Sequence, residues 1–322
     1  MSSLGHLGEF GLIARLTKGL PVSGAVVEGI GDDCAVLRWG DRLMLATCDA
    51  SLEEVHFSRR HTAAEDIGWR AAASALSDIA AMGGQPIFVL VTLACPKDTS
   101  VEFLEALYRG LSEAVQTADA VVVGGDTTGS TSGVVIDIAV LGEATGERPL
   151  LRRDAHRGDY VVVTGYPGAS AAGLAALQQG IDAPDLMRAH WRPQPRIAEG
   201  QWLARRPEVH AMIDVSDGLS QDAGHIADAS GLTIALNSAS VPVHPALHRH
   251  ADQLALDPIA VSLSGGEAYE LAFTVAGESV LEDFREAFPD LPATVVGRCE
   301  AGPARVLIDG QPAPAHGFQH FG

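Results

Sequence analysis

The sequence predicts an α/β (α+β) fold with two domains. Its 322 residues suffice for two domains of ordinary size. Hydrophobic residues make up 47% of the chain and charged residues 20%, which is typical of a globular protein rather than a disordered one. Short apolar runs alternate with longer segments of helical periodicity, so strands and helices are expected to share a domain.

The first half of the chain is expected to begin with a helix and a β-hairpin. Helices are predicted over residues 9–20, 63–82 and 101–117, and strands over residues 34–39, 42–48, 87–95, 120–123 and 134–142. Gly40-Asp41 is the hairpin signal between the first two strands. The second helix contains the small residues AAASALSD, so another element is expected to pack very close to it. The strand at 120–123 is predicted to be buried and to enter a turn at Gly124-Gly125.

Residues 146–159, with the sequence GERPLLRRDAHRGD, are rich in charge and turn residues and predict a domain boundary. We therefore expect one domain over residues 1–148 and a second over residues 149–322. In the second domain, strands are predicted over residues 160–164, 210–215, 269–275, 294–298 and 305–308, and helices over 170–179 and 217–229. Residues 184–196 are expected to form a connection broken by proline.

Composition excludes several functional classes. The 22 basic and 41 acidic side chains give a net charge of −19, which argues against a nucleic-acid-binding protein. The longest apolar run, residues 87–95, is too short to span a membrane. The four cysteines lack CxxC spacing, and residues 1–20 lack the apolar segment of a secretory leader. We therefore expect a soluble protein of the reducing cytoplasm.

Lysine is almost absent from the chain. Only Lys18 and Lys97 occur, and neither lies in a P-loop or in a kinase-type strand motif. A nucleotide would therefore have to be held by metal ions, backbone N–H groups and arginine.

Aspartates recur at the ends of strands or helices beside small residues. They are Asp32, Asp33, Asp49, Asp78, Asp126, Asp214 and Asp217. Four have an ordinary structural alternative: Asp217 could cap a helix, Asp32 and Asp33 could form an Asx-turn, and Asp78 could be solvated. Asp49 and Asp126, which follow apolar strand residues, are harder to explain in this way. Taken together, a strand-end carboxylate beside glycine suits a hard cation, and a shared site for several metal ions is the favoured interpretation.

The same segments resemble the thiamine-monophosphate kinase family, which belongs to the superfamily of aminoimidazole-ribonucleotide synthetase, selenophosphate synthetase and a hydrogenase maturation factor. The resemblance extends from about residue 8 to the closing HGFQHF. It is carried by GEFGLIARL, GIGDDCAVL, ATCDASLEEVHF, IGWRAAASALSDIAAMGGQP, VVVGGDTTGS, VTGYPGASAAGLAAL, DVSDGLSQDAGHIADASG and SGGEAYELAFTV. The VHF element, the GGE-YEL element and the terminal GF-HF are the parts most specific to the kinase.

The resemblance implies an N-terminal α/β domain whose mixed sheet pairs across a homodimer, and a C-terminal α+β domain. It implies transfer of the γ-phosphoryl group of ATP to thiamine monophosphate with several Mg²⁺ ions. The implied magnesium ligands are Asp33, Thr47, Cys48 (through its backbone carbonyl), Asp49, Asp78, Asp126, Asp214 and Asp217, of which Asp49, Asp78 and Asp126 are the candidate catalytic residues. The implied ATP contacts are Tyr108, Gly125, Asp126, Arg152 and Ser216, and the implied thiamine-phosphate contacts are His56, Glu267 and Phe318.

The chain also departs from the family pattern. Ala268 stands where an Asp is usual, Glu54 where a Gly is usual, and Ala75 where an Asn is usual. Another ATP-dependent enzyme of the superfamily is one alternative, although Cys34 is misplaced for selenophosphate synthesis and no cysteine ends the chain as in the maturation factor. A non-catalytic protein that binds magnesium nucleotide or thiamine phosphate is the other alternative, and Ala268 alone favours it.

Overall fold

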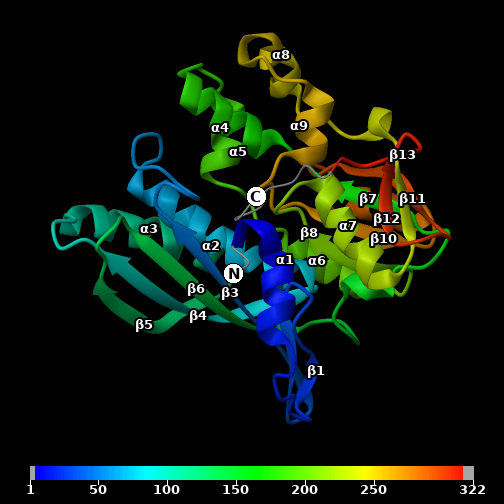
Figure 1. Ribbon diagram of the computed structural model, residues 1–322, viewed down its shortest axis with the longest axis horizontal. Helices are drawn as coiled ribbons and strands as arrows, with labels where there is room; N and C mark the ends of the chain where they lie inside the picture. Colours follow the sequence, from blue (N-terminus) through cyan, green and yellow to red (C-terminus); the bar gives the residue numbers. More distant parts are fainter. Residues whose placement is uncertain (1–3, 315–322) are drawn as a thin grey trace.

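The computed structural model describes residues 4–314, and over these residues the chain forms two β-sheets with helices packed around them (Figure 1). The first sheet has the strand order β1-β2-β3-β6-β4-β5, and the second has the order β13-β12-β9-β11-β7-β10-β8. Both sheets are mixed, because β5 is parallel to β4 and β12 is parallel to β9. The predicted α/β (α+β) class is therefore confirmed. None of the helices in this part of the chain is long and apolar enough to cross a membrane.

The first sheet and its helices come from the first half of the chain. The strands are β1 (Val26–Glu28), β2 (Ala35–Trp39), β3 (Arg42–Leu52), β4 (Gly84–Cys95), β5 (Val121–Gly129) and β6 (Val135–Ala144), and the helices are α1 (Leu4–Thr17), α2 (Ala64–Ala81) and α3 (Val101–Thr117). The predicted hairpin at Gly40-Asp41 joins β2 and β3. Helix α1 begins at Leu4 rather than Glu9, and its apolar side chains Ile13 and Leu16 are exposed.

The prediction for the VVVGGD segment was wrong. Strand β5 is an exposed edge strand, and it continues through both glycines to Gly129 instead of turning at them. The two glycines let the strand follow β4 past an irregularity in the register. A Cβ on Gly125, whose φ is 152°, would lie 1.8 Å from the carbonyl oxygen of Val91, so only glycine fits this approach.

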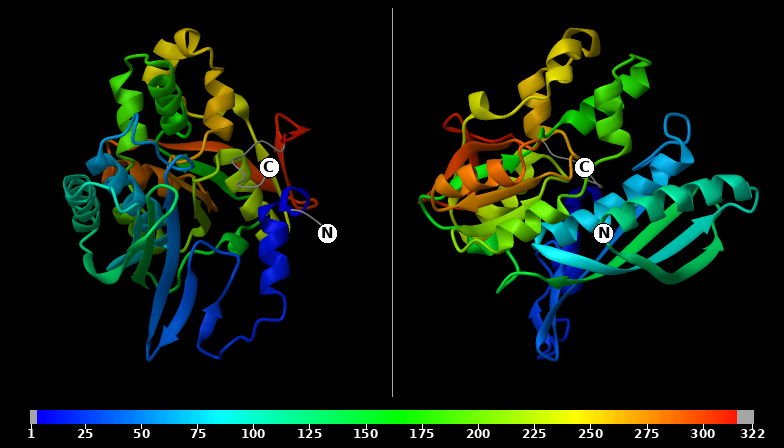
Figure 2. Two further views of the ribbon diagram at one scale, coloured as in Figure 1. Left: turned by 60° about the vertical axis from the view of Figure 1, so that its left-hand side comes forward. Right: turned by 180° about the vertical axis from the view of Figure 1, so that it is seen from behind.

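The second sheet comes from the second half of the chain. Its strands are β7 (Tyr160–Thr164), β8 (Val209–Asp214), β9 (Thr233–Leu236), β10 (Leu271–Val275), β11 (Ala293–Glu300), β12 (Arg305–Ile308) and β13 (Gln311–Pro312). The helical elements are η1 (Arg152–Asp154), α4 (Ala169–Gln179), α5 (Pro184–Trp191), α6 (Ile197–Ala204), α7 (Leu219–Ser230), η2 (Ser238–Ser240), α8 (Pro245–Leu254), α9 (Pro258–Ser264) and α10 (Ser279–Ala287). Helices α4, α5, α8 and α9 project together beyond this sheet (Figures 1 and 2).

Two local predictions in this half need correction. Residues 184–196 contain helix α5, because Pro184 occupies the first helical position, where its missing N–H costs nothing, and the helix ends before Pro193. Helix α7 begins at Leu219, and Gly218 rather than Asp217 precedes it. Asp217 therefore lies one residue before the N-cap position, where its side chain accepts a hydrogen bond from Gln221 Nε2 at 2.7 Å and lines the site described below.

Helix α2 connects the two sheets. Most of its residues are buried, and it contacts β3, β4 and β6 of the first sheet as well as α6 and β8 of the second. Helices α2 and α3 approach closely at Gly68 and Gly110, which lie outside the AAASALSD run that predicted a close approach. A Cβ on Gly68 would lie 1.9 Å from the Leu107 carbonyl oxygen, and one on Gly110 would lie 1.8 Å from that of Glu65. Small residues therefore set the distance between these two helices.

We predict that Gly110→Ala destabilises the protein, although alanine is the better helix former. The added methyl group must push against the backbone of α2, and overpacking of this kind costs about 1–3 kcal/mol. Urea unfolding measures the change. Gly24→Ala is the control, because a Cβ at Gly24 meets nothing within 4 Å. Equal unfolding midpoints for Gly110→Ala and the parent would contradict the packing argument.

Candidate functional site

A cavity of about 390 Å³ lies where α2 meets β3, β8 and the segment that precedes β10. Among the residues that line it are eight of the predicted site residues: Cys48, Asp49, His56, Asp78, Asp214, Ser216, Asp217 and Glu267. These residues are separated by up to 219 positions in sequence, from Cys48 to Glu267. The fold therefore brings the predicted metal-ligating and thiamine-phosphate positions to one place.

Three carboxylates meet at this site, and two of them, Asp78 and Asp214, line the cavity. Asp33, Asp78 and Asp214 each offer an oxygen, and these oxygens lie within 4.8 Å of one another. Two short hydroxyl contacts orient them: Thr47 donates to Asp78 at 2.5 Å, and Ser77 donates to Asp214 at 2.8 Å. Asp214 is the last residue of β8 and is buried, so the strand fixes its direction.

Burial and mutual repulsion disfavour the charged forms of these acids. Removal from water, followed by the charge of Asp33, raises the pKa of Asp214 to about 8. Burial and then the charges of Asp214 and Asp49 raise the pKa of Asp78 well above its ordinary value. Burial also raises the pKa of Asp49, and it raises that of Asp32 to about 7. Such a group of oxygens is stable as carboxylates only with cations among them, and an all-oxygen donor set fits Mg²⁺.

Arg152 is the arginine that reaches this cluster from η1. Its Nη2 lies 2.5 Å from Asp33 Oδ1, and its backbone N–H donates to Asp32 at 3.1 Å. Arg153, by contrast, points outward and pairs with Glu28. Of the neighbouring arginines in RRDAHR, Arg152 is therefore the one placed beside the carboxylates.

The segment before β10 holds Glu267 in a constrained conformation. Glu267 and Tyr269 have φ values of 60° and 52°, which are uncommon outside glycine. Their N–H groups donate to the carbonyl oxygens of Ser216 and Val215 at 2.7 and 2.9 Å. These bonds to the end of β8 keep the strained turn in place, so Glu267 and Ser216 are positioned together.

Sequence reasoning missed two supporting residues. Arg70, which is buried in α2, forms an ion pair with Glu267 and lies 2.5 Å from His190 Nε2. Asp222 is buried in α7 and accepts hydrogen bonds from the N–H groups of Asp217 and Gly218. The sequence offered a signal for each: Arg70 is a charged residue beside the small residues of the helix, and Asp222 is a second Asp after SDG.

Comparison with known proteins agrees with this geometry. The chain matches the family AIR synthase related protein, N-terminal domain, over residues 31–144, and its C-terminal domain family over residues 156–310. Thiamine-monophosphate kinase of Mycobacterium tuberculosis is 36% identical over 325 residues, covering 99% of this chain and 93% of the relative. That of Escherichia coli is 37% identical over 328 residues, covering 98% of each.

The chain belongs to the thiamine-monophosphate kinase family. It is an enzyme of that family, as the resemblance in its motifs predicted. The structure of AaThiL complexed with AMPPCP and TMP matches with a TM-score of 0.88 and 34% identity, over 99% of both chains. The crystal structure of thiamine monophosphate kinase from Aquifex aeolicus matches with a TM-score of 0.82 and 32% identity, over 94% of this chain and 97% of that one.

Three predicted ATP contacts of the kinase family lie away from the cavity. Tyr108 is on α3, where it borders a shallow hollow formed by that helix alone. Gly125 and Asp126 are on β5, at the outer edge of the first sheet (Figure 1). Phe318, a predicted thiamine-phosphate contact, is outside the residues that the structure describes.

The strand register gives the separation of Asp126 from the carboxylates. Across the sheet, Asp126 pairs with Thr92, and Thr92 pairs with Asp137. Asp137 in turn pairs with Ala50, the neighbour of Asp49. Three strand spacings amount to roughly 14 Å. Within one chain, Asp126 is therefore too far from Asp49 for both to bind the same ion.

The departures from the kinase family pattern also have a structural setting. Ala268 lines a neighbouring cavity of about 310 Å³, together with Arg196 and Glu270, rather than the carboxylate cavity. Loss of an Asp at this position therefore leaves the cluster of Asp33, Asp78 and Asp214 intact. Glu54 has a φ of 63°, a conformation that glycine adopts freely, which explains why glycine is usual there.

We predict that Mg²⁺ stabilises the protein more at pH 8 than at pH 6. Asp214 has a pKa of about 8 in the folded chain against an ordinary 3.8, so between these values the folded state holds a proton that the unfolded state lacks. Stability of the metal-free protein therefore falls as the pH rises through this window. Mg²⁺ binds the deprotonated carboxylates and reverses this loss, by about 2.7 kcal/mol at a concentration of 100 Kd.

Calorimetric melting in EDTA and in Mg²⁺ at both pH values tests this prediction. Asp214→Asn is the matched variant, and the difference between the two pH values should shrink in it. A magnesium-induced shift in Tm that is equal at pH 6 and pH 8 would show that the carboxylates are not the binding groups.

Proposed function

We propose that this enzyme transfers the γ-phosphoryl group of ATP directly, in line and with Mg²⁺, to thiamine monophosphate, giving thiamine diphosphate and ADP. The observation that carries the proposal is the convergence of Asp33, Asp78 and Asp214, because Asp78 and Asp214 line the same cavity as His56 and Glu267. The relatives named thiamine-monophosphate kinase align over nearly the whole chain, and AaThiL was solved with TMP and the ATP analogue AMPPCP.

The residues that would hold Mg²⁺ are the oxygen donors predicted from the sequence. They are Asp33, Thr47, Cys48 through its backbone carbonyl, Asp49, Asp78, Asp126, Asp214 and Asp217. Bound Mg²⁺ would screen the negative charges of the two substrates and stabilise charge that develops on the transferred phosphoryl group. No lysine lines the cavity, so among its lining residues Arg70 is the fixed cation, and it is already paired with Glu267.

The chain's own residues then have to position the acceptor. A phosphate oxygen of thiamine monophosphate is already ionised, so the reaction requires no general base. The His56 ring is fixed because its Nδ1 accepts the Leu52 N–H at 3.0 Å. The carboxylate of Glu267 is positioned by its ion pair with Arg70. His56 and Glu267 thus provide two rigid polar contacts for thiamine monophosphate at one end of the cavity.

A homodimer would complete the site. One face of the first sheet is covered by α2, whereas Phe88, Leu90 and Leu141 are exposed on the other face, next to the exposed edge strand β5. An apolar surface of this kind indicates a protein interface. We propose that a second copy covers it and brings its own Asp126, with Gly125 and Tyr108, to the carboxylates of the first copy. This arrangement accounts for the separation of Asp126 from Asp49 within one chain.

The kinase assay tests the proposed reaction. With ATP and Mg²⁺, we expect ADP and thiamine diphosphate to form with thiamine monophosphate, and not with free thiamine. Asp78→Asn and Asp126→Ala should each lower kcat by at least about 100-fold, because each loses a ligand to ions that contribute several kcal/mol to the barrier. Magnesium-dependent ATP binding without turnover would support the non-catalytic alternative instead.

Mixing two inactive variants tests the dimer. In a heterodimer of Asp78→Asn and Asp126→Ala, one site has intact carboxylates from one chain and Asp126 from the other. Random reassociation should therefore restore about a quarter of the parent activity, since half of the dimers are mixed and each has one complete site. Absence of recovery in a mixture shown to contain heterodimers would place Asp126 and the carboxylates in the same chain. Leu90→Arg should yield a monomer by light scattering.

A further inference from the structure

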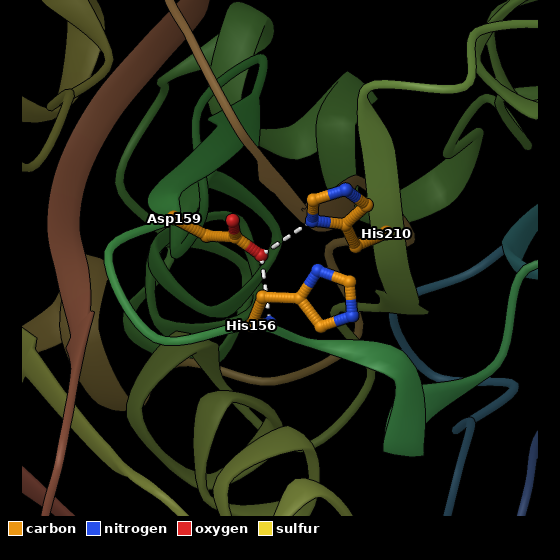
Figure 3. Close-up of side chains that lie close together, drawn as sticks. All are labelled: His156, Asp159 and His210. Atoms are coloured by element: carbon orange, nitrogen blue, oxygen red, sulfur yellow. Dashed lines mark hydrogen bonds and ion pairs between the residues drawn. The ribbon is translucent and has the colours of Figure 1, made fainter.

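A second group of metal-ligating side chains lies apart from the carboxylate cavity (Figure 3). His156 and Asp159 are in the loop before β7, and His210 is on β8. Each offers one ligand atom, and the three atoms lie within 4.8 Å of one another. Asp159 Oδ2 lies 2.8 Å from His210 Nδ1 and accepts the His156 backbone N–H at 2.8 Å. The two imidazole rings pack against each other with their centroids 4.0 Å apart.

The negative charge of the Asp159 carboxylate is only partly compensated by its neighbours. Asp159 is only 3% exposed. Within residues 4–314, its carboxylate forms an ion pair with His210. Two arginines of this region have other partners, since Arg148 pairs with Asp154 and Arg298 lies over the Tyr160 ring, and Arg157 of the same loop is exposed. A buried carboxylate without a fixed cation is unfavourable. The two histidines lie on the side of this carboxylate that solvent reaches, since His156 is exposed and His210 is partly so.

The three ligands are also held rigidly. The Gly158 N–H donates to the Cys299 carbonyl oxygen at 2.8 Å, and the Cys299 N–H donates to the Asp159 carbonyl oxygen at 2.9 Å. These bonds attach the ligand loop to β11. His210 lies in β8, which pairs with β10 on either side of it, at Val209 and Met212, across an irregularity in the register. A site held by two strands and a pinned loop loses little conformational freedom when an ion binds.

We propose that His156, Asp159 and His210 bind one divalent transition-metal ion of the Zn²⁺ class, with water in the fourth position. Two imidazoles and one carboxylate with an open position are a typical Zn²⁺ donor set, and nitrogen ligands favour such ions over Mg²⁺. The carboxylate cavity, by contrast, offers oxygen ligands suited to Mg²⁺. Binding breaks the hydrogen bond between His210 Nδ1 and Asp159 Oδ2, and the neutral imidazole then binds the ion through Nδ1 and carries its proton on Nε2.

Such an ion would act structurally. It would link β8 to the loop that follows η1. Arg152 lies in η1, and Asp214 is the last residue of β8. Both residues belong to the carboxylate site. The proposal itself concerns binding of the ion alone and does not depend on the kinase reaction.

Calorimetric titration with Zn²⁺, in excess Mg²⁺ and without ATP or thiamine monophosphate, tests this site. Excess Mg²⁺ occupies the carboxylate cavity, so we expect one Zn²⁺ to bind per chain. His156→Ala should weaken this binding at least about tenfold, and His248→Ala, an exposed histidine on α8, should leave it unchanged. Co²⁺ should give a visible absorption band of four-coordinate intensity with the parent and not with His156→Ala.

Two outcomes would overturn the proposal. One is the absence of Zn²⁺ binding to the parent under these conditions. The other is equal affinity of the parent and His156→Ala. Because His156 is exposed and its backbone N–H is retained in the variant, loss of binding cannot be attributed to unfolding once the melting temperatures match.

Discussion

Repulsion among buried carboxylates is the constraint on which the rest of the structure depends. Asp33, Asp78 and Asp214 come from a loop, a helix and a strand end, and their oxygens meet in a region that excludes most water. Charge concentrated in this way destabilises a folded chain unless cations are present. The chain supplies one nearby guanidinium, that of Arg152, and orients the acids with the hydroxyls of Thr47 and Ser77. The proposed Mg²⁺ ions would compensate this charge.

Helix α2 makes this concentration of charge achievable. It carries Asp78 and Ser77 at one end and Arg70 nearer the other, so a single rigid element faces both the carboxylate cluster and Glu267. Its small residues allow α3 and α6 to approach closely, which leaves the polar side chains as the groups that project into the cavity. The same helix thus combines close backbone packing at Gly68 with the charged side chains that line the cavity.

Much of the fold and of the site could be predicted from the sequence, and the failures share a cause. Helices such as α3 have a clear apolar periodicity, and an aspartate beside glycine at the end of a strand can be identified as a candidate site residue from its immediate neighbours. The exposure of β5 could not be predicted, because an edge strand and a buried strand have the same apolar run until the neighbouring strands are known. Arg70, Asp222 and the group of His156, Asp159 and His210 were missed because their roles come from contacts between distant segments.

The central claim is that the buried carboxylates bind Mg²⁺ in place of protons. Titrating Mg²⁺ into metal-free protein at pH 7, in two buffers of different ionisation enthalpy, measures the protons released on binding. With the pKa of Asp214 at about 8 and that of Asp78 well above its ordinary value, the account predicts release of about one proton or more per chain. Magnesium binding with the same heat in both buffers, and hence no proton release, would contradict it.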